Sequence, residues 1–180
     1  LGLPVFVKPA RGGSSIGVSK VNSWEEFPAA VDLALEDDEK ILVEPEIVGQ
    51  EVEIGVLHYA DGTLLASVPA LLAGIDDSDE GFYGFDTKYL DNVVTAEIPA
   101  PFTPELTEKL RDMAVRAFEA LNCEGLSRVD FFVTEDSVYI NEINTLPGFT
   151  PISMYPQVLA ASGVEYPALL EALIEQALAK

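Results

Sequence analysis

Two short stretches, Arg128-Val129-Asp130 and Asn141-Glu142-Ile143-Asn144, decide how this chain folds and where its chemistry lies. Each belongs to a run of alternating apolar and polar residues, which predicts one strand over residues 125–133 and a second over 137–143. The short, polar connection between the runs indicates that the strands pair as a hairpin.

The register of this hairpin would gather polar side chains on one face. Successive side chains of a strand point to opposite faces, so Arg128 and Asp130 share a face, as do Glu142 and Asn144. With residues 135–137 as a three-residue loop, Asp130 lies opposite Glu142 and Arg128 lies opposite Asn144. Carboxylate and amide oxygens suit Mg²⁺, so the set predicts a magnesium site. A solvated polar face beside a turn is the alternative, because acidic residues are so common here.

The composition limits the classes of function. The 180 residues hold 31 Asp and Glu against 10 Lys and Arg, a net charge of −21, which argues against binding of nucleic acids or anionic membranes. A single cysteine, Cys123, and a single histidine, His58, exclude an internal disulfide and leave little material for a catalytic triad. The longest apolar stretch, residues 63–75, is too short to span a membrane. We therefore expect a cytoplasmic protein.

A second motif lies near the start of the chain, where Lys8 ends a predicted strand over residues 5–8. The following Gly12-Gly13-Ser14-Ser15 segment carries no bulky side chains, so its N–H groups and hydroxyls could surround a phosphate chain. The spacing is that of neither a Walker A loop nor a dinucleotide fingerprint, and an ordinary flexible turn is the alternative.

The remaining patterns predict a mixture of strands and helices. A Ser23–Glu26 capping box predicts a helix start, although Pro28 favours a later one. Strands are predicted at 40–44 and 51–59, and Asp61-Gly62 turns the chain into another through residue 70. Thr103-Pro104 opens an amphipathic helix, and two more helices close the chain. Because strands and helices do not alternate strictly, we expect an α+β fold.

The order of these motifs is more specific than any one of them. Lys8 with its Gly/Ser loop is followed by Glu44, Glu51, Lys88-Tyr89, and then residues 127–131 (SRVDF) and 140–150 (INEINTLPGFT). This series, from Val5 to about Pro156, resembles the ATP-grasp ligases and, within them, the D-alanine–D-alanine ligase family. The resemblance implies a partial ATP-grasp fold, with residues 1–44 as the end of the small lobe and 45–180 as the C-terminal lobe.

The resemblance also implies residue roles, beginning with the nucleotide. Lys8 would contact phosphates, with Gly13, Ser14 and Ser15 folded over them and Ser14 also near the substrate. Backbone groups of Pro45 and Ile47 would read adenine beside Glu44, although the family often has lysine where Pro45 stands. Glu51 would hold the ribose, Lys88 would reach the γ-phosphate, and Tyr89 would help close the acidic loop over the site.

For the metal and substrates, the implied set is Asp130, Glu142 and Asn144 around two Mg²⁺ ions, with Mn²⁺ as an alternative ion. Arg128 and the Gly148 N–H would form an oxyanion site, and Ser153 with the Met154 N–H would hold the second substrate's carboxylate. The implied reaction joins two D-alanines through an acyl phosphate at the expense of ATP, for peptidoglycan precursors. Positioning and charge neutralisation would supply most of the catalysis.

Several alternatives stay open. The family's N-terminal domain and the start of the small lobe are missing from this sequence, so we expect little or no ligase activity from the chain alone. The full-length protein would be a homodimer. Ligation of D-alanine to D-lactate or D-serine, or nucleotide binding without turnover, would fit similar motifs. An acidic calcium loop at residues 76–81 lacks the glutamate required at its twelfth position, where Thr87 stands.

Overall fold

A computed structural model describes residues 1–73 and 95–179. Within these ranges the contacts separate a small unit, residues 1–48 with Thr95, from a large unit, residues 49–73 and 96–179. The domain boundary predicted after residue 44 remains a prediction.

The small unit is a three-stranded antiparallel sheet with one helix. Its strand order is β2-β1-β3, with β1 at Val5–Pro9, β2 at Ser19–Val21 and β3 at Ile41–Pro45. Alternate β1 side chains are buried, and they pack with α1, Phe27–Asp37, into a small apolar core. The opposite face of β1 therefore presents Phe6 and Lys8.

The start of α1 differs from the predicted capping box. The helix begins at Phe27, with Pro28 in its first turn, and Glu26 as N-cap makes no side-chain capping hydrogen bond. The Glu26 carboxylate instead accepts a hydrogen bond of 2.9 Å from the Asn22 N–H. Proline is well tolerated in the first turn and poorly tolerated further in, which explains the later start.

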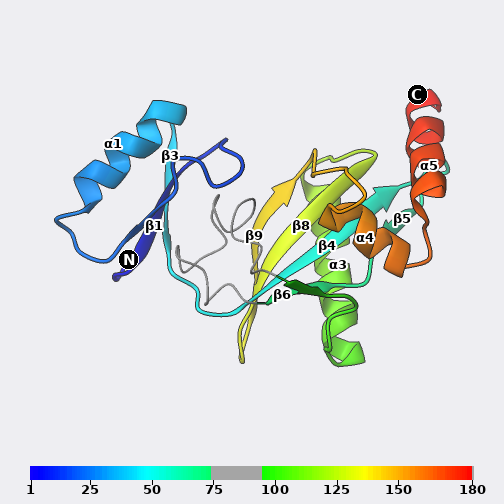
Figure 1. Ribbon diagram of the computed structural model, residues 1–180, viewed down its shortest axis with the longest axis horizontal. Coiled ribbons are helices and arrows are strands. Elements are labelled where there is room, and N and C mark those ends of the chain that lie inside the picture. Colours follow the sequence, from blue (N-terminus) through cyan, green and yellow to red (C-terminus); the bar gives the residue numbers. More distant parts are fainter. Residues whose placement is uncertain (74–94, 180) are drawn as a thin grey trace. The chain divides into compact units, whose positions relative to one another are not determined.

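The large unit is built on a sheet of six strands, which runs in the order β7-β6-β4-β8-β9 with β5 paired to β4 (Figure 1). Every pairing described within it is antiparallel. Its strands are β4 Gln50–His58, β5 Leu64–Ala66, β6 Ala70–Ala73, β7 Thr95–Glu97, β8 Leu126–Val133 and β9 Val138–Asn144. Gly62 has a positive φ of 87°, which supports the turn predicted at Asp61-Gly62 between β4 and β5.

Helices cover both faces of this sheet. The amphipathic helix α3, Pro104–Ala120, packs on the face that bears Val52, Ile54 and Val56, and its N-cap Thr103 accepts a hydrogen bond from the Leu106 N–H. On the other face lie α4, Met154–Ala161, and beyond it α5, Tyr166–Leu178 (Figure 1). The predicted α+β class is confirmed.

The β8–β9 hairpin has the predicted pairs but a different turn. Asp130 pairs with Glu142 and Arg128 with Asn144, as expected. However, Val133 pairs with Val138, and the Thr134 N–H donates to the Ser137 carbonyl, so the three-residue loop was wrong by one residue. A bulge between the Phe131–Ile140 and Asp130–Glu142 pairs compensates for the shorter turn and restores the register.

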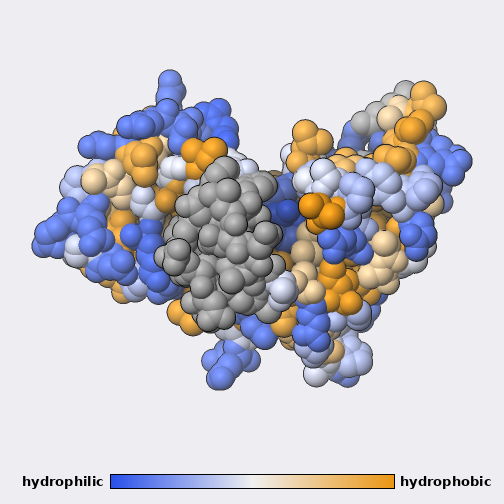
Figure 2. Space-filling model, in the orientation of Figure 1, coloured by the Kyte–Doolittle hydropathy of each residue, from blue (hydrophilic) through white to orange (hydrophobic). Residues whose placement is uncertain are grey.

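Hydrophilic residues dominate the visible surface, with hydrophobic residues interspersed among them (Figure 2). This agrees with a net charge of −21. Among the described residues, none of the helices combines the length and the apolar character that crossing a bilayer requires.

Candidate functional site

Three carboxylates form a row across the middle of the large unit's sheet. Glu53 on β4 pairs with Asp130 on β8, which in turn pairs with Glu142 on β9. Paired residues of neighbouring strands place their side chains on the same face, so the register brings these acids side by side. Their surroundings differ: Glu53 is 3% exposed, whereas Glu142 lies on the open edge strand.

Arg128 is the cation within this row. Its Nε and Nη2 atoms donate to the two oxygens of Asp130, each at 2.7 Å, which is a bidentate pair. Its Nε also lies 3.2 Å from the Oε2 atom of Glu53. The guanidinium is thus held from two strands, and its side chain keeps only 16% of its exposure.

Burial disfavours the charged form of Arg128, whereas the neighbouring acids favour it. Desolvation lowers the pKa of Arg128, but the hydrogen bonds and charge of Asp130, with the charges of Glu53 and Glu142, raise it by more. The net result is a raised pKa, so Arg128 stays a cation.

Asn144 joins the same cluster from β9. Its Nδ2 atom donates to the Oδ2 atom of Asp130 at 2.9 Å and lies 3.5 Å from the Oε1 atom of Glu142. The side chains of the three predicted metal ligands therefore lie next to one another, with the Asn144 amide beside both carboxylates. A half-turn of the amide would present an oxygen instead of a nitrogen there, which completes an oxygen-only set.

The charges of the cluster suit a divalent cation. Three carboxylates, Glu53, Asp130 and Glu142, and one guanidinium, Arg128, give −3 + 1 = −2. Across residues 1–73 and 95–179, no three acidic, histidine or cysteine side chains group as a ready metal site. The set that fits Mg²⁺ thus consists of two carboxylates and an amide, and Mg²⁺ commonly takes waters or phosphate oxygens as its further ligands.

Behind β9, a tight turn leads into α4 and holds the predicted substrate residues. A Cβ atom on Gly148 would lie 3.0 Å from the Ser153 hydroxyl, so a glycine allows this close approach. Ser153 is the N-cap of α4 but makes no side-chain capping hydrogen bond, so it leaves the first-turn N–H groups uncapped. These groups, including that of Met154, form a site of positive potential suited to a carboxylate.

In the small unit, the predicted phosphate lysine is paired with the predicted adenine residue. The Lys8 Nζ atom lies 2.7 Å from Glu44 Oε2, and Lys20 makes a similar pair with Glu46 at 2.6 Å. Glu44 lies opposite Phe6 in the register of β1 and β3, which puts it on the face that carries Lys8. This face therefore carries both of the small unit's main predicted nucleotide contacts.

The Gly/Ser loop has an unusual backbone and a firm anchor. Ser14, Ser15 and Gly17 have positive φ angles of 53°, 57° and 72°. Arg11, at its base, donates from Nε and Nη2 to the Asp38 carboxylate at 2.9 and 2.6 Å. A Cβ atom on Gly13 would meet nothing within 4 Å, so that position is sterically open to a ligand.

The other described residues predicted to bind the nucleotide are spread over β3, β4 and the segment between them. Pro45 ends β3, Ile47 lies two residues after it, and Glu51 lies on β4 two residues before Glu53 and on the same face. Lys88 and Tyr89 lie outside the described residues, as does the acidic segment considered for calcium.

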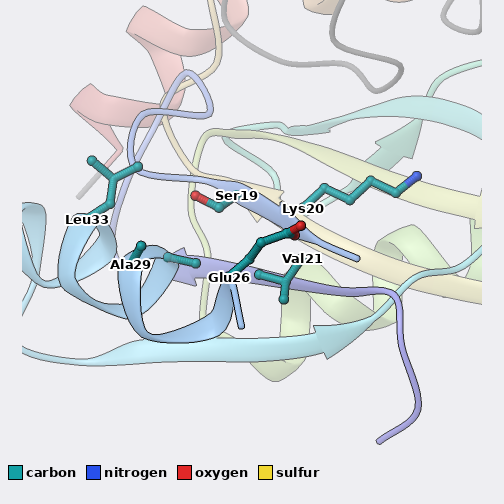
Figure 3. Close-up of a pocket in the computed structure, with 7 residues that line it drawn as sticks. Ser19, Lys20, Val21, Glu26, Ala29 and Leu33 are labelled. Carbon is teal, nitrogen blue, oxygen red and sulfur yellow. The ribbon is translucent and has the colours of Figure 1, made fainter. Parts of the chain in front are cut away.

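A separate hollow in the small unit contains none of the predicted site residues (Figure 3). It lies between β2 and α1, and its walls include Lys20, Val21 and Leu33. Two of its polar side chains are engaged, Lys20 with Glu46 and Glu26 with the Asn22 N–H.

Glu53 is the one member of the cluster that the sequence motifs did not single out. The alternation of β4 placed Val52, Ile54 and Val56 on the core face, and Glu53 alternates with them. The one feature of the sequence that points to Glu53 is its position two residues after Glu51, on the same face of the predicted strand.

The comparisons with known proteins bear directly on this arrangement. The family described as "D-ala D-ala ligase C-terminus" matches residues 1–175. The chain belongs to this family. A D-alanine–D-alanine ligase from Corynebacterium efficiens is 67% identical over 178 residues, which are 99% of this chain and 49% of that protein. The chain thus spans about half the length of the curated relatives it matches.

Solved structures agree on the fold. The VanG D-Ala:D-Ser ligase from Enterococcus faecalis has a TM-score of 0.83 at 35% identity, over 98% of this chain and 50% of that one. A D-alanine–D-alanine ligase from Bacillus anthracis complexed with ATP has a TM-score of 0.78 at 26% identity, over 98% and 53%. The expected ATP-grasp fold, in part, is confirmed.

Proposed function

We propose that residues 1–180 form the C-terminal half of an ATP-dependent ligase that joins two D-alanines into D-alanyl-D-alanine. Support comes from membership of the ligase family and from a relative of that name at 67% identity. The carrying observation is the convergence of Asp130, Glu142 and Asn144 beside Arg128. The full-length protein would act in the cytoplasm as a homodimer and supply peptidoglycan precursors.

The nucleotide would be bound mainly by the small unit. Lys8 and the Gly13-Ser14-Ser15 loop would hold the phosphates, which fits the positive φ angles and the open space at Gly13. To reach a phosphate, Lys8 would exchange its ion pair with Glu44 for the ligand. The remaining proposed contacts are Glu44, Pro45, Ile47, Glu51, Lys88 and Tyr89.

Asp130, Glu142 and Asn144 would hold Mg²⁺, in two ions. When bound, Mg²⁺ neutralises the charge of the transferring phosphoryl group. Asp130 would then turn from Arg128 toward the metal, while Glu53 keeps its contact with the guanidinium.

The chain's own residues would then orient two substrates. A carboxylate oxygen of the first D-alanine attacks the γ-phosphorus of ATP, ADP leaves, and an acyl phosphate forms. The neutral amine of the second D-alanine attacks the acyl carbon, the C–O bond to phosphate breaks as the amide forms, and the nitrogen gives up one proton to the departing phosphate. Arg128 and the Gly148 N–H would stabilise the oxyanion of that addition, while Ser153 and the Met154 N–H hold the second carboxylate.

A second candidate differs only in the second substrate. A D-Ala:D-Ser ligase is the neighbour with a TM-score of 0.83, so the fold itself accommodates a different second amino acid. The sequence identity of 67% to a D-alanine–D-alanine ligase favours D-alanine.

Three measurements test the proposal: the reaction of the full-length ligase, the effect of Arg128→Ala on it, and nucleotide binding by residues 1–180. A full-length ligase that contains residues 1–180 should release phosphate from ATP when D-alanine is added, and should form D-alanyl-D-alanine rather than D-alanyl-D-serine. Arg128→Ala should lower kcat by about 10²–10³. Residues 1–180 alone should bind Mg-ATP without making dipeptide. Absence of D-alanine-dependent phosphate release from the full-length protein would overturn the proposal, and a loss below fivefold would remove Arg128 from its role.

A further inference from the structure

The turn that precedes α4 is closed by two side chains, Ser153, which the proposed mechanism uses, and Thr150, which it does not. The Thr150 N–H donates to the Ser153 Oγ atom at 3.0 Å, and the two hydroxyl oxygens lie 2.9 Å apart. The Ser153 N–H donates back to the Thr150 carbonyl at 2.8 Å. Three hydrogen bonds therefore tie these two residues together.

The sequence removes one of the two usual capping partners of the Ser153 hydroxyl. A serine N-cap commonly accepts from the N–H of the second or third helical residue. The third residue of α4 is Pro156, which has no N–H. The Ser153 hydroxyl instead faces back to Thr150, and it lies close to Gly148, where a Cβ atom would come within 3.0 Å.

The donors and acceptors of this hydroxyl can be counted. A serine hydroxyl has one proton to donate and two acceptor sites. The Thr150 N–H, which can only donate, fills one acceptor site. If the Thr150 hydroxyl donates into the second, then Ser153 has no acceptor left, and its own proton must point to another group. With the opposite direction, Ser153 would present an acceptor lone pair instead, which a carboxylate repels.

We propose that Thr150 is a positioning residue that fixes the direction of the Ser153 hydroxyl, so that Ser153 donates to the carboxylate of the second amino-acid substrate. The inference rests on the proposed function, since that function supplies the carboxylate. Thr150 acts through Ser153 and need not touch the substrate. Donation from Thr150 also polarises the Ser153 hydroxyl and strengthens its outward hydrogen bond.

Other contacts hold the turn in place without this hydroxyl. The Gln157 Nε2 atom donates to the Ile152 carbonyl at 2.7 Å, and the Ser153–Thr150 backbone bond needs no side chain. Thr150 is exposed at the surface, so a substitution there leaves the apolar core intact. A change of the Thr150 hydroxyl can therefore be tested with little risk to folding.

The experiment uses four single variants, and one double variant, of the full-length ligase that contains residues 1–180. Thr150→Val removes the hydroxyl but keeps the shape and the backbone N–H, and Thr150→Ser restores the hydroxyl. Ser153→Ala removes the partner, and Thr63→Val is a matched control at an exposed threonine in the β4–β5 turn. Steady-state kinetics would give separate KM values for ATP and for the first and second D-alanine.

We expect Thr150→Val to raise KM for the second D-alanine about 3- to 10-fold, the range for loss of one hydrogen bond. The KM for ATP should not change, Thr150→Ser should behave like the wild type, and Thr63→Val should have no effect. In the Ser153→Ala background, Thr150→Val should add less than twofold, since the hydroxyl it orients is gone.

The outcomes separate this inference from the proposed function. If the wild type makes dipeptide and Ser153→Ala raises KM, but Thr150→Val does not, the positioning role is overturned while the ligase function stands. Equal losses from Thr150→Val and Thr150→Ser, or additive losses with Ser153→Ala, would also overturn it. If the wild type makes no dipeptide, the proposed function itself fails.

Discussion

Glu53 on β4 and Asp130 on β8 hold Arg128 between them, with the guanidinium Nε atom 3.2 Å from Glu53 and 2.7 Å from Asp130. The two acids are direct neighbours across the strands. Neither carboxylate is in open solvent, since their side chains keep 4% and 15% of their exposure. Removing the Arg128 cation should therefore lower the free energy of unfolding more than removing either carboxylate.

This asymmetry gives the first prediction, for the protein without Mg²⁺. Arg128→Met removes the cation between the buried Glu53 and the partly buried Asp130, and should lower the free energy of unfolding by about 3–5 kcal/mol. Glu53→Gln leaves Arg128 paired with Asp130 and keeps an acceptor oxygen, so it should cost only about 1–2 kcal/mol. Urea unfolding of both variants measures the difference. A larger loss from Glu53→Gln would contradict this account of the cluster.

The pairs of the β8–β9 hairpin could be predicted from the sequence, but the path of the chain could not. Alternation specifies which side chains share a face, and it put Asp130 opposite Glu142 correctly. It does not reveal a bulge, because one extra residue in an edge strand changes neither the apolar pattern nor the composition. The predicted turn was one residue too long, and the bulge cancelled that error.

Glu53 was missed for a different reason. A glutamate that alternates with valine and isoleucine is typical of a strand with one solvated face. Here β4 is a central strand, with β8 on one side and β5 and β6 on the other, and α4 covers part of the second face. Strand order is a tertiary property, so the burial of Glu53 could not be predicted from its neighbours in sequence.

Gly55, two residues after Glu53, gives the second prediction. A Cβ atom there would lie 2.5 Å from Leu159 Cδ2 and 3.1 Å from the Tyr155 ring. The close packing of α4 on β4 therefore requires a residue without a side chain at position 55. Gly55→Ala should destabilise the protein by about 1–3 kcal/mol through overpacking. Adding Leu159→Val should recover part of this loss in thermal unfolding. Gly2→Ala, where a Cβ atom meets nothing within 4 Å, is the control.

Two fully buried serines of the large unit give a matched third prediction. Ser67 Oγ accepts from the Gly55 N–H at 2.9 Å and donates to the Val68 carbonyl at 2.8 Å, whereas Ser127 Oγ has no hydrogen-bond partner in the described part of the chain. Ser67→Ala should therefore cost about 1–3 kcal/mol, and Ser127→Ala should be neutral or stabilise by up to about 1 kcal/mol. Urea midpoints at equal m-values test both, and a destabilised Ser127→Ala would show that its hydroxyl is satisfied.

The fourth prediction concerns pH and the anchor of the Gly/Ser loop. Hydrogen bonds from the Arg11 side chain and the Lys40 N–H lower the pKa of Asp38 well below its ordinary value, against the opposing effect of burial. A carboxyl with a lowered folded pKa stabilises the protein above its unfolded pKa, about 3.9. That contribution is lost as the pH falls further, through the folded pKa.

Asp38→Asn removes this contribution at every pH. The wild type should therefore melt above Asp38→Asn by a constant margin at neutral pH, and the margin should shrink as the pH falls below about 4. Thermal unfolding across the pH range measures it, with Glu36→Gln as a control for the same charge change on an exposed carboxylate of α1. A margin that grows toward low pH would reverse the sign and show that the Arg11–Asp38 pair does not hold the loop to the end of α1.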